Sequence, residues 1–278
     1  MASNDPMQPS QPRHDRRRFL RLAAGVTTGA LLSGCGAGGS TPGDSIRTVA
    51  GTAVPVAGAT SAGTGAGTGA GAATGQVPLN LALNLAYLGA QYYGHAAGGT
   101  GLPATLTGGV GVAGPVSGAR RASFADALTA SHAAELAGDK QAHVVALRAY
   151  LGELAAAQPA LDLSPAPSGA FSLAAQRAGI VPAGGAFDPY ADDSGFLLGA
   201  FLIQNAVAAA YRTLLAQTEP AAAALVGANL ADSIYHGGLI RALLDDRAAR
   251  DPSIARAMAN AGALLAAHDA ADAGDQTP

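Results

Sequence analysis

The chain is short of the residues that would cross-link it or attract nucleic acid. Only one of its 278 residues is a cysteine, Cys35, which excludes a disulfide within a single copy. Charged residues make up 13% and aromatic residues 5% of the chain. Residues 1–34 hold five arginines and two aspartates, and the rest keeps 11 basic and 17 acidic side chains, a net charge of −6. An acidic chain without basic runs lacks the electrostatic footprint of a nucleic-acid-binding protein, so we expect no nucleic-acid partner.

The apolar run near the N-terminus is too short for a membrane span. It covers Leu22–Leu32, whereas a bilayer takes about 20 apolar residues, but its length suits the hydrophobic region of a signal peptide. An arginine pair and a hydrophobic pair precede it: Arg16, Arg17, Phe19 and Leu20. This order resembles a twin-arginine export signal. We therefore interpret residues 1–34 as a signal peptide that directs the folded protein out of the cytoplasm.

The residues after the apolar run predict a lipid anchor and a tether. Leu32-Ser33-Gly34-Cys35 resembles a bacterial lipobox, in which the cysteine becomes the lipidated first residue of the mature chain. We expect the membrane to be a partner through the lipid on Cys35, at the periplasmic face or the cell surface; no feature identifies a protein partner. Residues 35–76 are rich in Gly, Ala and Thr. Such a linker of about 40 residues behaves as a flexible coil spanning roughly 30–40 Å.

Helical periodicity appears in four blocks after the linker. We expect helices at residues 78–97, 123–151, 193–217 and 220–244. Pro78 suits a first helical turn, and Asp193 or Ser194 suits a cap for the third helix. A shorter helix at 252–268 is expected to pack outside the others. We therefore assign residues 77–250 to a helical bundle and 251–278 to a C-terminal helix and tail.

The connections between the blocks favour one topology. Residues 153–192 form a long connection with a short helix at 171–178, and residues 98–122 form an ordered loop or small hairpin. A long crossover between helices two and three lets two helical hairpins pack antiparallel, as in ferritin-like bundles. The expected fold is an all-α, antiparallel four-helix bundle with this crossover and a short C-terminal helix.

Five segments together resemble the ferritin-like family that includes the desiccation-related proteins of bacteria and plants. They are Leu79–Leu85, Gly101–Ala104, Gly184–Tyr190, Phe196–Phe201 and Tyr235–Arg241. The resemblance covers residues 77–244, which is nearly all of the expected bundle. It implies a ferritin-like fold and, by association, a role in desiccation or stress.

The resemblance also implies a place for a dinuclear metal site. Such a site takes one glutamate from each of two helices and a Glu-x-x-His from each of the other two. His143 and His236 stand where the two histidines belong. The four glutamate positions hold other residues: Ala86, Lys140, Gln204 and Ser233. Because two neighbouring cations need several anionic oxygens, this residue set indicates a vestigial centre.

Lys140 adds an argument against a metal. Its ammonium group would repel a cation, and it supplies a positive charge of its own. A buried ammonium needs partners or loses its proton, and Gln204, Ser233 and Tyr93 are available besides the imidazoles. We expect a metal-free polar network inside the bundle. The same residues leave open a neutral Lys140 that acts as a base or nucleophile.

The sequence favours a non-enzymatic envelope lipoprotein with a structural or stress-related role and no cofactor. The alternative is an iron- or manganese-binding, oxidase-type protein that uses His143 and His236, with Asp139 or Asp232 as displaced ligands. If the carboxylate of Asp139 or Asp232 lies within metal-ligand distance of a point that both imidazoles also reach, this alternative is favoured. If the Lys140 nitrogen occupies that point, the metal-free network is favoured. A third possibility is haem or a small molecule held between the helices by the histidines.

Overall fold

The computed structural model describes the backbone of residues 69–274 and the side-chain surroundings of residues 76–263. Three predicted features lie outside this range: most of the linker, Cys35, and the export-signal residues Arg16, Arg17, Phe19 and Leu20. The predictions of export and lipidation therefore stay predictions.

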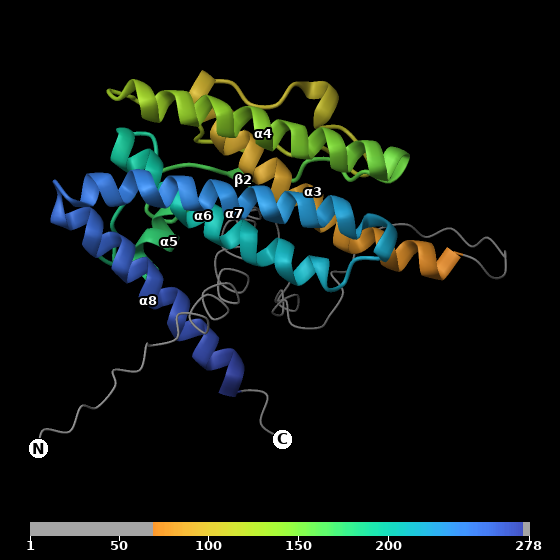
Figure 1. Cartoon of the computed structure of the whole chain (residues 1–278). Coiled ribbons are helices and arrows are strands. Elements are labelled where there is room, and N and C mark those ends of the chain that lie inside the picture. Colours follow the sequence, from red (N-terminus) through yellow and green to blue (C-terminus); the bar gives the residue numbers. More distant parts are fainter. Residues whose placement is uncertain (1–68, 275–278) are drawn as a thin grey trace, which may run out of the picture.

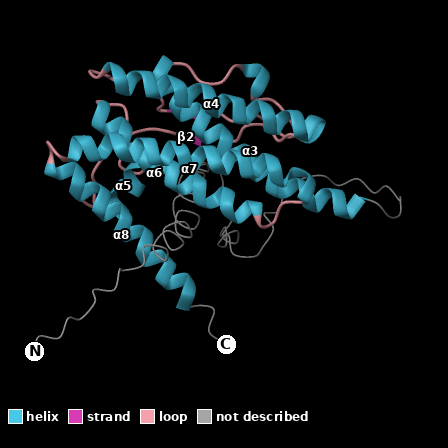
Figure 2. Ribbon diagram, viewed as in Figure 1, coloured by secondary structure: helices cyan, strands magenta, loops and turns pink. Residues whose placement is uncertain are grey.

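Four long helices form the bundle (Figures 1 and 2). They are α3 (Gly69–Gly98), α4 (Ala127–Leu151), α6 (Asp193–Leu215) and α7 (Pro220–Ala248). Helix α3 packs along α4, and α6 packs along α7, so the bundle consists of two helical hairpins. The long segment between α4 and α6 joins the hairpins. The predicted all-α four-helix bundle, with its crossover between the second and third helices, is confirmed.

The first helix begins earlier than its sequence predicts. Helix α3 starts at Gly69, inside the stretch assigned to the linker, and Pro78 lies within the helix rather than in its first turn. The prediction treated proline and the glycines before it as a helix boundary. An interior proline costs a helix one hydrogen bond and a clash with the preceding turn, yet α3 is helical on both sides of Pro78.

Carboxylates at the helix ends connect the two hairpins. Asp126 caps α4, accepts a hydrogen bond from Thr129 Oγ1 at 2.7 Å and one from Arg247 of α7 at 2.9 Å. Asp193, buried in the first turn of α6, accepts from the backbone N of Asp126 at 3.3 Å. The cap of α6 is Asp192 rather than Asp193 or Ser194. The Asp193 carboxylate instead accepts hydrogen bonds from the backbone at the start of α4.

The two long connections pair with each other. Strand β1 (Val116–Ser117) from the first connection lies parallel to β2 (Leu161–Asp162) from the crossover, and an isolated bridge joins Val110 to Ala156. The segment 98–122 is thus ordered, as expected, but it is not a hairpin, because its pairing partner is the crossover. Short helices complete the connections: η1 (Ala104–Leu106), η2 (Gly152–Leu154) and α5 (Ala170–Arg177).

Two buried glutamines attach these connections to α3. Gln91 of α3 donates to Gln158 of the crossover at 2.5 Å, and Gln158 donates to the backbone O of Gly114 at 3.3 Å. The paired backbones approach so closely at Gly114 that a Cβ there would collide with the backbone of Ala160. The pairing of the two connections therefore requires a glycine at this position.

Aromatic side chains fill one end of the core. Tyr92 lies 4.9 Å from Tyr93, 5.0 Å from Phe171 of α5 and 5.8 Å from Phe196 of α6, measured between ring centroids. Helix α6 is the one described helix long and apolar enough to cross a membrane, and most of it is buried in the bundle, as expected of a core helix.

Helix α8 (Pro252–Gly274) packs on the outside of the bundle, as predicted. It runs six residues beyond the predicted end at residue 268. Ile254 and Met258 are buried on its inner face, against the α6–α7 hairpin. The side chain of Asn260 donates to the backbone O of Gly179 at 3.2 Å, so α8 also contacts the crossover.

Gly114→Ala is expected to lower the free energy of unfolding by about 2 kcal/mol, because its methyl group would push the paired connections apart. Gly108→Ala is the control, since a Cβ at Gly108 meets open space and should change stability by less than about 0.5 kcal/mol. Urea unfolding followed by circular dichroism measures both. Equal stability of the two variants would contradict the described pairing.

Candidate functional site

The candidate site is built from the same short motif on two helices. Helix α4 carries Asp139 and Lys140, with His143 one turn later, and α7 carries Asp232 and Ser233, with His236 one turn later. On a helix, residues three and four positions apart share a face. Each histidine therefore lies beside the Lys or Ser of its own helix and beside the aspartate that precedes it.

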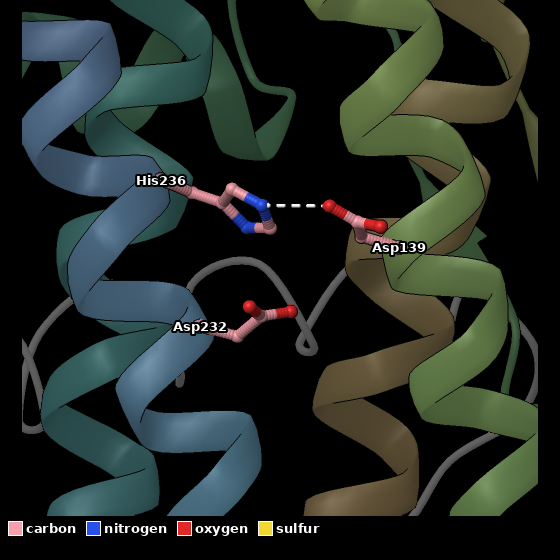
Figure 3. A group of neighbouring side chains, drawn as sticks. All are labelled: Asp139, Asp232 and His236. Carbon is pink, nitrogen blue, oxygen red and sulfur yellow. Dashed lines mark hydrogen bonds and ion pairs between the residues drawn. The ribbon is translucent and has the colours of Figure 1, made fainter.

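The two motifs are joined reciprocally. His143 Nε2 lies 2.7 Å from Asp232 Oδ2, and His236 Nε2 lies 3.0 Å from Asp139 Oδ2. Figure 3 shows the His236–Asp139 pair spanning the space between α7 and α4, with Asp232 one turn away on α7. Each hydrogen bond takes its imidazole from one hairpin and its carboxylate from the other.

Burial divides these groups into an inner and an outer set. The His236 side chain is 1% exposed, and His143 is buried as well. The side chains of Asp139 and Asp232 are 44% and 40% exposed. The imidazoles therefore lie inside the bundle, and the carboxylates lie at its rim, where solvent reaches them.

A second polar network lies deeper, among the predicted ligand positions. Lys140 Nζ donates to Ser233 Oγ at 3.2 Å, and Gln204 Nε2 donates to the backbone O of Ser233 at 3.3 Å. Tyr93 Oη donates to Gln204 Oε1 at 3.4 Å. All four residues are buried, and Ala86 is buried in α3 without a polar group to offer. The structure thus joins Lys140, Ser233 and Gln204 directly.

Burial controls the charges of the site. It lowers the pKa of Lys140 to about 8, although the carboxylates of Asp232 and Asp139 act in the opposite direction. Burial and the neighbouring Lys140 charge lower the pKa of His143 to about 4, and both also lower the pKa of His236. Near pH 7 the two imidazoles are neutral and Lys140 is largely charged.

The imidazoles use only one of their two nitrogens. A neutral imidazole that faces a carboxylate donates its Nε2–H, which leaves the lone pair on Nδ1. The Nδ1 atoms of His143 and His236 are buried and have no hydrogen-bond partner in the part of the chain that the structure describes. These lone pairs are the unsatisfied groups of the site.

Sequence reasoning found most of these residues but missed how they pair. It assigned both histidines, Lys140, Gln204 and Ser233 to a polar network inside the bundle, and it treated Asp139 and Asp232 only as displaced ligands of a metal. In the structure each aspartate bonds to the histidine of the opposite helix. The available signal was the same Asp-x-x-x-His spacing on both helices.

The arrangement can bind a cation at the rim more readily than in the interior. Ligand atoms of Asp139, Asp232 and His236 all lie within 4.8 Å of one another. The interior positions offer a hydroxyl, an amide and an ammonium group in place of carboxylates. Carboxylates and imidazoles are metal ligands, whereas a charged ammonium is not.

Lys140→Met is expected to raise the free energy of unfolding by about 2 kcal/mol at pH 7 in EDTA. Burying the ammonium lowers the pKa of Lys140 from its ordinary 10.5 to about 8, a penalty of about 3 kcal/mol that methionine avoids at the loss of one hydrogen bond. Gln141→Met, on the exposed neighbour, is the control.

The pH dependence of this effect has a fixed sign. Between pH 8 and 10.5 the unfolded lysine holds more protons than the folded one, so native stability rises with pH relative to the variant. The gap between native protein and Lys140→Met should therefore shrink across this window in urea titrations. A gap that widens, or a variant less stable than the native chain at pH 7, would show that the ammonium stabilises the bundle.

Comparisons with known proteins agree with the bundle. A family model described as a ferritin-like domain matches residues 77–246, which is more than half of the chain. No curated protein and no solved structure gives a match. The match covers all of α4 and all but the last two residues of α7, and it includes every residue of the candidate site. The chain belongs to the ferritin-like domain family.

Proposed function

We propose that this protein is an exported, lipid-anchored, ferritin-like protein without a dinuclear centre, with a non-enzymatic structural or stress-related role in the cell envelope. One observation carries the proposal. Lys140, at a position expected to hold a glutamate ligand, is 2% exposed and donates to Ser233, which stands at another such position. A desiccation-related role is the family association that accompanies it.

The residues present do not fit the dinuclear iron or manganese centre that the fold family implies. In favour of a metal, the buried Nδ1 atoms of His143 and His236 have no partner among the described residues. Against it, Ala86, Lys140, Gln204 and Ser233 provide no anionic oxygen at the four positions where two cations need them. The ammonium of Lys140 would also repel a cation. The charge balance therefore fails, and no redox step is assigned to the site.

The shape of the bundle supports a role without a substrate. A hollow of about 340 Å³ is lined by residues of α3, α4 and the loop after α3, and no titratable side chain lines it. Such a hollow offers no carboxylate, imidazole or amine to a bound molecule, and its one hydroxyl, of Thr100, has no such base beside it in the lining. Lys140 and Ser233, the two groups within reach of each other, are both buried. This favours a structural role over catalysis by Lys140.

The envelope location rests on the sequence of the N-terminal region. Arg16 and Arg17 begin the export signal, Cys35 would receive the lipid, and the Gly-rich stretch after it is a tether. Because α3 begins at Gly69, a coil of residues 36–68 would let the domain stand roughly 30 Å from the membrane.

Metal analysis tests the absence of the dinuclear centre. The full-length protein, produced in cells supplied with iron and manganese, should contain no stoichiometric amount of either metal by elemental analysis. A variant that restores four carboxylates should gain iron: Ala86→Glu, Lys140→Glu, Gln204→Glu and Ser233→Glu. Two irons per native chain would contradict the proposal, because the four positions would then not be the ligand positions.

Cell fractionation tests export and anchoring. Arg16→Lys with Arg17→Lys keeps the charge but removes the arginine pair, so the protein should accumulate in the cytoplasm, whereas Arg13→Lys should be exported normally. Cys35→Ala should be exported but recovered in the soluble envelope fraction rather than in the membrane. Export of the arginine-pair variant would refute the signal, and recovery of Cys35→Ala in the membrane fraction would refute the lipid anchor.

An iron- or manganese-binding oxidase that uses His143 and His236 is the second candidate. The observation that favours it is the grouping of Asp139 and Asp232 with His236 at the rim. If this candidate is right, the protein should bind iron and consume oxygen in an iron-dependent way, and His236→Ala should lose both properties. Iron without such oxygen consumption would exclude the oxidase activity.

A further inference from the structure

We propose that the rim of the bundle holds a single divalent cation of the zinc type, bound by Asp139, Asp232 and His236, which links the two helical hairpins. The site differs from a dinuclear centre in its ligands, its place and its role. It shares His236 with the implied dinuclear centre but takes the carboxylates of the rim in place of the four glutamate positions, and it involves no redox chemistry. It goes beyond the proposed function and leaves the metal-poor interior as described.

The donor set suits such an ion. One imidazole and two carboxylates are ligands that zinc accepts, with a fourth position left for water. Their ligand atoms lie within 4.8 Å of one another. Bonds of about 2.0–2.1 Å in a tetrahedron place ligand atoms roughly 3.3 Å apart. The His236–Asp139 separation of 3.0 Å is already close to that value.

His143 is placed to support the site from its edge. Its Nε2 lies 2.7 Å from Asp232 Oδ2, so it orients one of the two carboxylate ligands. Ligating carboxylates in metal sites are commonly held by hydrogen bonds of this kind. His143 thus acts as a positioning residue in the three-ligand site and becomes a ligand only if the Asp232 carboxylate moves aside.

The ion can enter without opening the bundle. Asp139 and Asp232 are 44% and 40% exposed, whereas His236 is buried behind them at 1%. When the ion replaces the proton on His236 Nε2, that proton moves to Nδ1 of the same ring. Nδ1 has no partner among the described residues, so no hydrogen bond is lost there.

The site would add a link between the two hairpins, which the His–Asp pairs and the Arg247–Asp126 pair already connect. Asp139 belongs to the α3–α4 hairpin, and Asp232 and His236 belong to the α6–α7 hairpin. An ion between them adds a link across the seam. Because the ion binds only the folded arrangement of these side chains, it raises the stability of the native state.

Zinc titration of the metal-free, full-length protein tests the proposal. Calorimetry should give one zinc per chain, and zinc at roughly a hundred times its Kd should raise the Tm by about 5–10 °C relative to EDTA. Asp139→Asn with Asp232→Asn should abolish both effects. The matched control is Asp245→Asn with Asp246→Asn, two exposed aspartates of α7 that lie outside the site.

A measurement on the native protein does not depend on how the variants fold. Zinc should shift the Nε2 resonance of His236 in ¹⁵N NMR spectra and leave the imidazole of His95, near the end of α3, unchanged. Zinc binding that survives loss of both aspartates would overturn the proposal, and so would a coordination shift at Nδ1, which would place the ion in the interior. Two irons per chain would contradict the proposed function, whereas failure to bind zinc would contradict only this inference.

Discussion

Two reciprocal hydrogen bonds fix the relation between the hairpins, from His143 to Asp232 and from His236 to Asp139. The helices around them are rich in alanine and glycine, and small side chains bury little apolar area each. The seam between α4 and α7 therefore depends strongly on its polar contacts. Because each pair draws on both helices, rotating or sliding one helix would break both bonds. The same register brings Lys140 opposite Ser233.

The charge balance of the interior follows from this register. Four glutamates around two divalent cations would be neutral as a group, and removing the carboxylates removes the reason for the cations to bind. Lys140 supplies one positive charge in place of the cations, and the carboxylates of Asp139 and Asp232 partly compensate this charge from the rim. Gln204 and Ser233 hydrogen-bond within the network without adding a charge, while Nδ1 of His143 and of His236 has no partner among the described residues. The interior is thus consistent electrostatically as a network of protein groups alone.

Helical periodicity was sufficient to predict the bundle, because the buried residues of α4 and α7 recur every three or four positions and most of α6 is buried. It also placed His143, His236 and Lys140 on inward faces. It failed where the answer depends on distant parts of the chain. The loop after α3 pairs with the crossover about 45 residues away, and each aspartate accepts a hydrogen bond from the histidine of the other hairpin. The start of α3 was missed because Pro78 carries a local boundary signal that the longer helix overrides.

On α4, neighbouring residues contribute to two different parts of the site: the rim, where a cation could bind, and the buried polar network. Asp139 and Lys140 are neighbours in sequence, yet one carboxylate reaches solvent while the ammonium next to it is buried. Both histidines donate the N–H of Nε2 to an aspartate of the opposite hairpin, although the four interior glutamate positions hold other residues. These pairs need no metal, because they hold the hairpins together. The two pairs therefore have a structural role of their own, and family membership alone does not establish activity.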